Sequence, residues 1–258
     1  MPGALSQDDA RIRLEWGPRG ASETSAGAGF AVVVDVLSFT TTLSVAVDRG
    51  IDVFPYRWKD NGAIDFAQAH SATLAVGRLE AQRQPGYSAV SLSPFSVREA
   101  DGLGRLVLPS PNGSTICSEL ADTGATVLGA CLRNRSAVAR WLAAQLDSPS
   151  STAITVVAAG ERWPGDGSLR PAVEDMWGAG AVVAALEDLG AGPLSPEAAT
   201  AAGAFRAVQP SLSAVLARCS SGRELSEAGF SDDVRIASEL DASICVPVLR
   251  GSRFVNAA

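Results

Sequence analysis

The sequence has a single histidine, four cysteines and no long apolar run, and each of these scarcities excludes a class of protein. His70 lies in a helical stretch remote from the other polar motifs, so we expect neither a histidine-based catalytic triad nor a zinc site. No Cys-x-x-Cys pair is present, which indicates separate buried thiols in a reducing compartment. The longest apolar run, residues 30–34, ends at Asp35, so no membrane span is expected.

Positive charge is scarce as well, and the formal net charge is −7. No basic run is interleaved with aromatic residues, so we expect no nucleic-acid partner. Residues 1–10 lack an apolar core and carry Asp8 and Asp9 where a signal peptide would be positive, which predicts a cytoplasmic protein. With 258 residues, 47% of them apolar, the chain is long enough to bury a sizeable core. We expect one domain over residues 1–258.

Short β-branched runs alternate with helical patterns over most of the chain. Strands are expected over residues 11–16, 30–36, 51–55, 73–76, 106–108, 126–128, 154–158 and 244–248. Helices are expected over residues 40–48, 64–70, 114–120, 136–146 and from Pro171 to about 186, and a Gly/Ser/Ala loop over 17–29. The alternation predicts a three-layer α/β/α fold with a mostly parallel or mixed sheet.

The pattern changes after Ser195. Four consecutive short helices are expected over residues 196–205, 211–218, 221–228 and 231–240, several with serine at the N-cap. These segments predict a helical C-terminal subregion over residues 195–242 that packs on the α/β part.

Polar residues follow five of the predicted strands. They are Asp35 and Ser38; Gly77, Arg78 and Glu80; residues 109–114; Gly129, Arg133 and Asn134; and Gly160, Glu161 and Arg162. Because ligands of an open α/β sheet bind beyond the carboxyl ends of its strands, these groups are expected to converge. The sequence therefore predicts a polar pocket at one edge of the sheet.

The densest charge lies where the strand at 154–158 leads into the next helix. Glu161, Arg162 and Arg170 occupy the loop, and Glu174 and Asp175 lie in the first turns of the helix. Paired carboxylates and arginines at such a junction are typical of a metal or phosphate site. The two helix carboxylates have a simpler alternative role, which is to complement the helix dipole.

Three other strand ends also have two interpretations. Asp35 caps the following helix or has a function, and we favour function because a buried lone carboxylate needs a cation or hydrogen-bond donors. Residues 111–114 form a turn, and they also aim backbone N–H groups and hydroxyls at an anion. Arg133 either points to solvent or binds a phosphate or sulfonate through its planar fork.

At these residues the sequence resembles the 2-phosphosulfolactate phosphatase family. The matching segments are 32–37 with 40–42, 111–114, 132–134 with 136–138, and 174–175 with 178–180, and residues 86–87 with 93–94 form a weaker match. The resemblance implies a Mg²⁺-dependent acid phosphatase of α/β/α fold that releases phosphate from 2-phospho-3-sulfolactate on the route to coenzyme M. Two places differ, since the family typically has arginine at Ser38 and Glu-Arg at Arg78 and Leu79.

The leading hypothesis is a Mg²⁺-dependent phosphatase acting on a small anionic phosphate ester. Asp35, Glu174 and Asp175 are the expected metal ligands, and Asn134 is expected to orient water or substrate. The residues expected to bind substrate are Ser110, Asn112, Gly113 and Ser114 for the phosphate, and Arg133, Arg162 or Arg170 for a second acidic group. Whether Asp35 is instead a covalent nucleophile stays open.

Two rival hypotheses remain. The first is a non-catalytic protein that binds small anions in the same pocket. The second is a cysteine-dependent hydrolase that uses Cys219 or Cys245, although neither has a histidine nearby in sequence. The expected partner is a small-molecule phosphate ester, with no nucleic acid or membrane, and a homodimer is left open.

Overall fold

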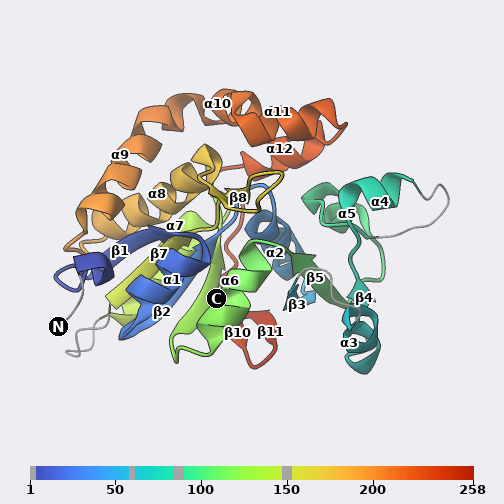
Figure 1. Ribbon diagram of the computed structural model, residues 1–258, viewed down its shortest axis with the longest axis horizontal. Helices are drawn as coiled ribbons and strands as arrows, with labels where there is room; N and C mark the ends of the chain where they lie inside the picture. The colour runs from blue at the N-terminus through green and yellow to red at the C-terminus, as the bar shows by residue number, and fades with distance from the viewer. Residues whose placement is uncertain (1–3, 58–61, 84–89, 147–152) are drawn as a thin grey trace.

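The computed structural model describes residues 4–57, 62–83, 90–146 and 153–258, and a β-sheet forms its middle layer (Figure 1). Nine strands make this sheet in the order β1-β7-β2-β6-β10-β11-β3-β5-β4. They are β1 (Ile12–Trp16), β2 (Ala28–Val34), β3 (Asp52–Arg57), β4 (Thr73–Leu74), β5 (Arg105–Ser110), β6 (Thr126–Ala130), β7 (Ala153–Ala158), β10 (Pro247–Arg250) and β11 (Arg253–Asn256). Two short strands, β8 (Glu161–Arg162) and β9 (Leu169–Arg170), form a separate antiparallel ribbon.

The sheet consists of two parallel groups joined by a hairpin. Strands β1, β7, β2 and β6 pair in parallel, and so do β3, β5 and β4. The β10–β11 hairpin lies between the groups and pairs antiparallel with β6 and with β3. The predicted α/β/α class with a mostly parallel, mixed sheet is confirmed. The strand expected over 244–248 begins only at Pro247, and its partner β11 is not among the expected strands.

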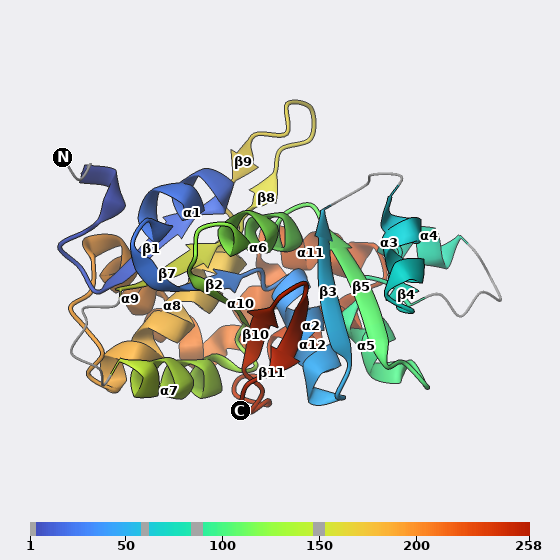
Figure 2. The same ribbon diagram turned by 90° about the horizontal axis from the view of Figure 1, so that it is seen from below.

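Strand β2 shows why the central strands are apolar throughout. Val32 and Val34 pack with α7 (Arg135–Gln145), α8 (Val173–Asp188) and α9 (Pro196–Val208), whereas Ala31 and Val33 pack with α1 (Gly17–Ser25) and α6 (Gly113–Ala121). Successive side chains point to opposite faces, so a strand covered on both sides needs apolar residues at every position. Figure 2 shows α1 and α6 on one side of the strands and α7 and α8 on the other.

Residues 17–29 are expected to form a loop, and this prediction is wrong because α1 occupies most of them. Gly17 adopts a φ of 60°, which glycine tolerates, and Pro18 lies in the first turn, where no N–H bond is lost. A Cβ at Gly20 would lie 2.7 Å from the Cβ of Glu15, so the helix packs closely on β1. The small residues that resemble a loop in the sequence are those that this close packing requires.

The remaining helices connect the strands or cover the sheet edge. They are α2 (Phe39–Asp48), α3 (Ala63–Ala69), α4 (Arg78–Gln82), α5 (Pro94–Glu99), α10 (Leu212–Arg218), α11 (Ser220–Glu227) and α12 (Ser231–Ala237). The short helices α4 and α5 are not among the expected elements. In the part of the chain that the structure covers, the helices fall short of the length and apolar character of a membrane span.

The four C-terminal helices are confirmed, and they position the edge where the site lies. Figure 1 shows α10, α11 and α12 passing over this edge beside β8. The Oγ atom of Ser195 accepts a hydrogen bond from the Ala198 N–H at 3.1 Å and caps α9. Serine does not cap α11, because the Cys219 sulfur accepts the Gly222 N–H there at 3.3 Å.

Candidate functional site

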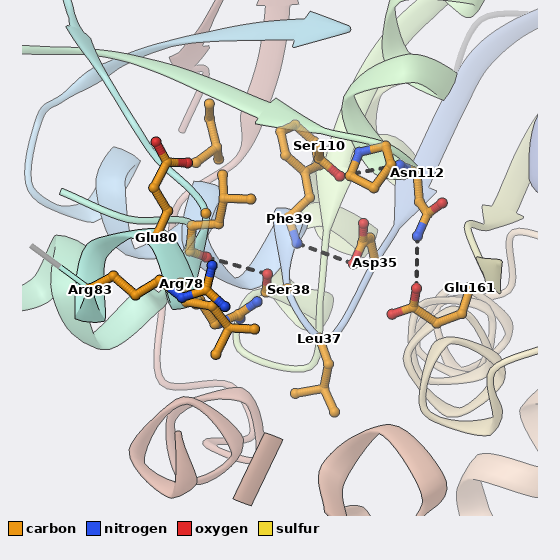
Figure 3. Close-up of a pocket in the computed structure, with 15 residues that line it drawn as sticks. Asp35, Leu37, Ser38, Phe39, Arg78, Glu80, Arg83, Ser110, Asn112 and Glu161 are labelled. Carbon is orange, nitrogen blue, oxygen red and sulfur yellow. Dashed lines mark hydrogen bonds between the residues drawn. The ribbon is translucent and has the colours of Figure 1, made fainter. Parts of the chain in front are cut away.

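A cavity of about 660 Å³ opens at the edge where β2 and β5 end. Its walls come from the turn after β2, the start of α4, the turn after β5 and the start of β8 (Figure 3). The lining residues that carry polar or charged side chains are Asp35, Ser38, Arg78, Glu80, Arg83, Ser110, Asn112 and Glu161. The predicted convergence of strand ends therefore produces a real cavity, although not every predicted residue reaches it.

Asp35 lies just after the end of β2, and its carboxylate accepts hydrogen bonds from the N-termini of two helices. Its Oδ1 accepts the Phe39 N–H of α2, and its Oδ2 accepts the Gly113 N–H of α6, each at 3.1 Å. Burial raises the pKa of the Asp35 carboxyl, while these backbone donors and the charge of Arg78 act in the opposite direction. The two interpretations of Asp35 are thus compatible, since it caps α2 and also lines the cavity.

Gly113 makes this arrangement sterically feasible. A Cβ at this position would lie 2.5 Å from Cδ1 of Phe39 and 2.8 Å from Oδ2 of Asp35. The backbone of α6 can therefore approach the carboxylate only through a residue without a side chain.

Asp175, in the first turn of α8, is buried beside Asp35. Its Oδ1 accepts the Val36 N–H at 2.7 Å, and its Oδ2 accepts the Gly160 N–H at 2.8 Å. Burial and the charges of Asp35 and Glu174 raise the pKa of Asp175 well above its ordinary value. Asp175 thus ties the ends of β2 and β7 to α8 and does not line the cavity itself.

Glu161 is the second carboxylate in the cavity wall. Its Oε2 accepts a hydrogen bond from the Asn112 amide at 3.0 Å. Burial, together with the charges of Asp35 and Glu174, raises the pKa of Glu161 to about 7, while Arg170 and Asn112 act to lower it. The carboxyl therefore exchanges its proton near neutral pH, as proton-transferring groups in enzymes commonly do.

Four carboxylates thus gather at one rim, namely Asp35, Glu161, Glu174 and Asp175. Within the described residues, no three His, Cys, Asp or Glu side chains lie close enough to hold a metal ion among them. Carboxylate oxygens are the type of ligand that Mg²⁺ prefers, and this ion commonly uses one or two carboxylates together with substrate phosphates and water. They do not form a cage of three protein ligands.

The turn after β5 contributes part of the predicted phosphate cradle. Ser110 and Asn112 line the cavity, and the Asn112 N–H donates to the Ser110 hydroxyl at 3.3 Å. Ser114 does not line it, because its hydroxyl is buried and donates to the Leu108 carbonyl at 2.7 Å. Ser114 therefore holds the turn. Of the predicted cradle only Ser110 and Asn112 line the cavity, because the Gly113 N–H is donated to Asp35.

The structure does not bring Arg133 and Asn134 into the cavity. Arg133 pairs with Asp48 at 3.3 Å and also with Glu239. Asn134 is fully buried, and its amide accepts the Cys131 N–H at 2.8 Å and donates to the Cys245 carbonyl at 3.3 Å. Both residues secure the turn after β6 against the segment that leads into β10, because β10 is the neighbour of β6 there.

Arg162 and Arg170 lie on the β8–β9 ribbon and line a second cavity of about 500 Å³. Arg170 donates to the Ser221 hydroxyl of α11 at 3.2 Å, and its guanidinium lies 5.8 Å from the ring centroid of Trp163. The second cavity is adjacent to the first, because four residues line both; these are Leu37, Arg78, Leu79 and Glu161.

Five polar cavity residues are missing from the predicted site, namely Ser38, Arg78, Glu80, Arg83 and Glu161. Of these, Arg78 and Glu161 lie at the junction with the second cavity. Each follows a predicted strand, so the strand-end rule identifies them, but it gives no reason to prefer them over Arg133. Of the weaker family match, Gly86 and Tyr87 lie outside the described residues. Ser93 accepts the Ser96 N–H and caps α5.

The cysteines are free and buried, as expected for separate thiols. Burial raises the pKa of Cys219 and of Cys245 to about 12. Since the thiolate is the nucleophilic form, neither residue has the environment of a catalytic cysteine.

The fold and site define an α/β protein with a polar cavity at the carboxyl edge of its strands, lined by carboxylates and arginines. A family model described as 2-phosphosulpholactate phosphatase matches residues 18–252, and the chain belongs to this family. The 2-phosphosulfolactate phosphatase of Methanothermobacter thermautotrophicus is 30% identical over 245 residues, which are 94% of each chain.

Two further relatives carry the name probable 2-phosphosulfolactate phosphatase. That of Parasynechococcus marenigrum is 33% identical over 84% of this chain and 87% of its own. That of Thermus thermophilus is 28% identical over 85% of this chain and 87% of its own. The protein is therefore a member of a phosphatase family along nearly its whole length.

Proposed function

We propose that the protein is a Mg²⁺-dependent phosphatase that hydrolyses a small phosphate ester carrying a second acidic group. The proposed reaction is 2-phospho-3-sulfolactate and water to 3-sulfolactate and phosphate, in the cytoplasm and on the route to coenzyme M. The observation that carries this proposal is Asp35, a buried carboxylate held by the N-termini of α2 and α6 in the wall of the cavity. Family membership supports the reaction class.

The phosphate would lie against the turn after β5. There the Ser110 hydroxyl and the Asn112 amide belong to side chains that line the cavity. A water molecule would attack phosphorus, and the bond from phosphorus to the ester oxygen would break. Glu161 would give its proton to the leaving oxygen and regain one from water, since its pKa of about 7 suits this transfer.

We propose that Mg²⁺ takes one or two of the three carboxylates Asp35, Glu174 and Asp175, with substrate and water completing its coordination. When bound, the ion would polarise the phosphoryl group and offset the negative charge of the rim. Arg162 and Arg170, on the wall of the adjacent second cavity, would attract the anionic substrate electrostatically.

The decisive experiment is a screen for phosphate release from a panel of phosphate esters, with Mg²⁺ and with a chelator. We expect release with Mg²⁺ and its loss with chelator. Asp35→Asn should lower kcat/KM by roughly 100-fold or more, because it removes charge from the reacting centre. Asp122→Asn, at the exposed end of α6, is the matched control and should leave release unchanged. Release that is undiminished in Asp35→Asn would refute the assignment.

A non-catalytic anion-binding protein is the second candidate. The observation that favours it is that backbone N–H groups already occupy both oxygens of Asp35 and both of Asp175. Thermal stabilisation by phosphate esters without any turnover would support this candidate over the phosphatase.

A further inference from the structure

Arg78 lies at the junction of the two cavities. It is the first residue of α4 and lines both of them. Figure 3 shows its side chain beside Ser38, across the cavity from Asn112 and Glu161. A cation therefore faces the phosphate-binding turn from the opposite wall.

One side of the Arg78 guanidinium is firmly held. Its Nε donates a hydrogen bond to Oδ2 of Asp233 at 2.7 Å. The Cζ atom of Arg78 lies 5.9 Å from the ring centroid of Phe230. Asp233 is 1% exposed, and its Oδ1 accepts hydrogen bonds from the Ser93 hydroxyl and from the Phe95 N–H. Helix α12 and the start of α5 thus fix the direction of the arginine.

One terminal nitrogen of the guanidinium lacks a protein partner. The Nη2 atom of Arg78 is buried and has no hydrogen-bond acceptor among the described residues. An unpaired buried donor is costly, and it costs most when the group is charged. A guanidinium that is fixed at Nε and unpaired at Nη2, in a cavity wall, is arranged to receive an anion.

On the opposite wall the turn after β5 offers the phosphate two other polar side chains, Ser110 and Asn112. A substrate that spans the cavity from the turn at 110–113 would place its second functional group near Arg78. The planar fork of arginine matches a carboxylate or a sulfonate.

We propose that Arg78 binds the acidic group of the substrate that is not transferred, and that Asp233 is the residue that positions it. This inference rests on the proposed phosphatase function and makes Arg78 its specificity-determining residue. The substrate class is then a 2-phospho acid, in which a carboxylate or sulfonate lies within two or three bonds of the phosphate-bearing carbon. Simple alkyl phosphates lack the group that Arg78 binds.

A matched pair of substrates tests the role of Arg78. 2-Phospholactate and isopropyl phosphate differ only in that a carboxylate replaces one methyl group. We expect Arg78→Gln to lower kcat/KM for 2-phospholactate by about 10- to 100-fold, mainly through a higher KM, and to change that for isopropyl phosphate by less than about threefold. Arg78→Lys should fall between, because lysine keeps the charge and loses the fork.

Two more variants separate positioning from folding. Asp233→Asn should lower kcat/KM for 2-phospholactate selectively, by a smaller factor than Arg78→Gln. Arg235→Gln, which affects an exposed ion pair with Asp232 on the same helix, should leave both substrates unchanged. Equal losses on both substrates in Arg78→Gln, or no loss on either, would overturn the inference.

The failure of the proposed function gives a different result. If the wild type releases phosphate from no ester, the phosphatase proposal fails, and the role of Arg78 is then read from binding. In that case 2-phospholactate should raise the melting temperature of the wild type more than isopropyl phosphate does, and this difference should vanish in Arg78→Gln. Equal shifts by the two esters in the wild type would overturn the inference.

Discussion

At the scale of single residues, Glu161 is the clearest case of a side chain whose chemistry is set by its surroundings. Its ordinary pKa of 4.5 rises to about 7 through burial and the neighbouring carboxylates. Between these values the folded protein holds a proton that the unfolded chain has released. The free energy of unfolding therefore falls as pH rises from about 4.5 to 7, and it stays at the lower level above 7.

We predict that the Glu161→Gln variant is more stable than the wild type at pH 8, and that the difference is much smaller at pH 5. The rise in the pKa of Glu161 from 4.5 to about 7 limits this gain in the free energy of unfolding to about 3 kcal/mol. Urea denaturation at both pH values measures this difference. The same variant should lose the fall in kcat/KM above pH 7 that loss of the Glu161 proton causes in the wild type. Glu197→Gln, in the exposed first turn of α9, should show neither effect.

The sequence predicts only part of the structural role of Gly113. The Asn-Gly pair predicts a turn, but the structure places Gly113 at the start of α6, against Asp35 and Phe39. We predict that Gly113→Ala costs about 1–3 kcal/mol of stability, because a Cβ would overlap both neighbours. Gly203→Ala is the control, since its Cβ meets nothing within 4 Å inside α9. It should stabilise by about 0.5–1 kcal/mol, and equal effects in urea denaturation would contradict the argument.

Among the predicted site residues, Asp35, Ser110 and Asn112 line the cavity, because each lies at or just after the end of a buried strand. Arg133 and Asn134 also follow a buried strand, yet they secure a turn to the C-terminal segment. The strand-end rule predicts which edge a residue reaches. It does not predict whether another part of the chain already provides its partner.

At the scale of elements, helix starts show how far local sequence determines structure. Serine precedes or begins each of the four C-terminal helices, but its hydroxyl caps only α9 among them. The N-cap position depends on the backbone turn before the helix, and that turn depends on packing that the local sequence does not contain.

We predict that Ser195→Ala lowers the free energy of unfolding by about 1 kcal/mol, because it leaves the Ala198 N–H without its acceptor. Ser231→Ala is the matched control. Ser231 is exposed and lies inside α12, whose N-cap residue is Phe230, so its replacement should change stability by less than about 0.5 kcal/mol. Chemical denaturation of the two variants side by side distinguishes them, and equal losses would show that the cap at Ser195 contributes nothing specific.

At the scale of the whole molecule, the fold class is predictable because strands buried on both faces must alternate with covering helices. The central hairpin is not predictable in the same way. Strands β10 and β11 pair with β6 and β3, which are far away in the sequence, and two short apolar runs give no indication of these partners. The contacts of the site are equally hard to predict from sequence, because Arg78 pairs with Asp233, which lies far away along the chain.

The position of the hairpin implies that the two parallel groups of strands unfold together. Phe254 of β11 is fully buried, and its ring lies 6.3 Å from that of Phe39 at the start of α2. We predict one cooperative unfolding transition for the wild type, monitored by both fluorescence and circular dichroism. Phe254→Ala should lower its free energy by about 3–5 kcal/mol, because the cavity left behind lies between the two groups.

Phe95→Ala is the control for this prediction, because Phe95 is 40% exposed and should matter much less. Phe254→Ala should also weaken phosphate-ester binding, since Phe39 lines the cavity and donates its N–H to Asp35. Two separate transitions in the wild type would mean that the parallel groups are independent units. The hairpin would then be a surface link between them, and a substitution at Phe254 would leave the half that contains β1 and β7 intact.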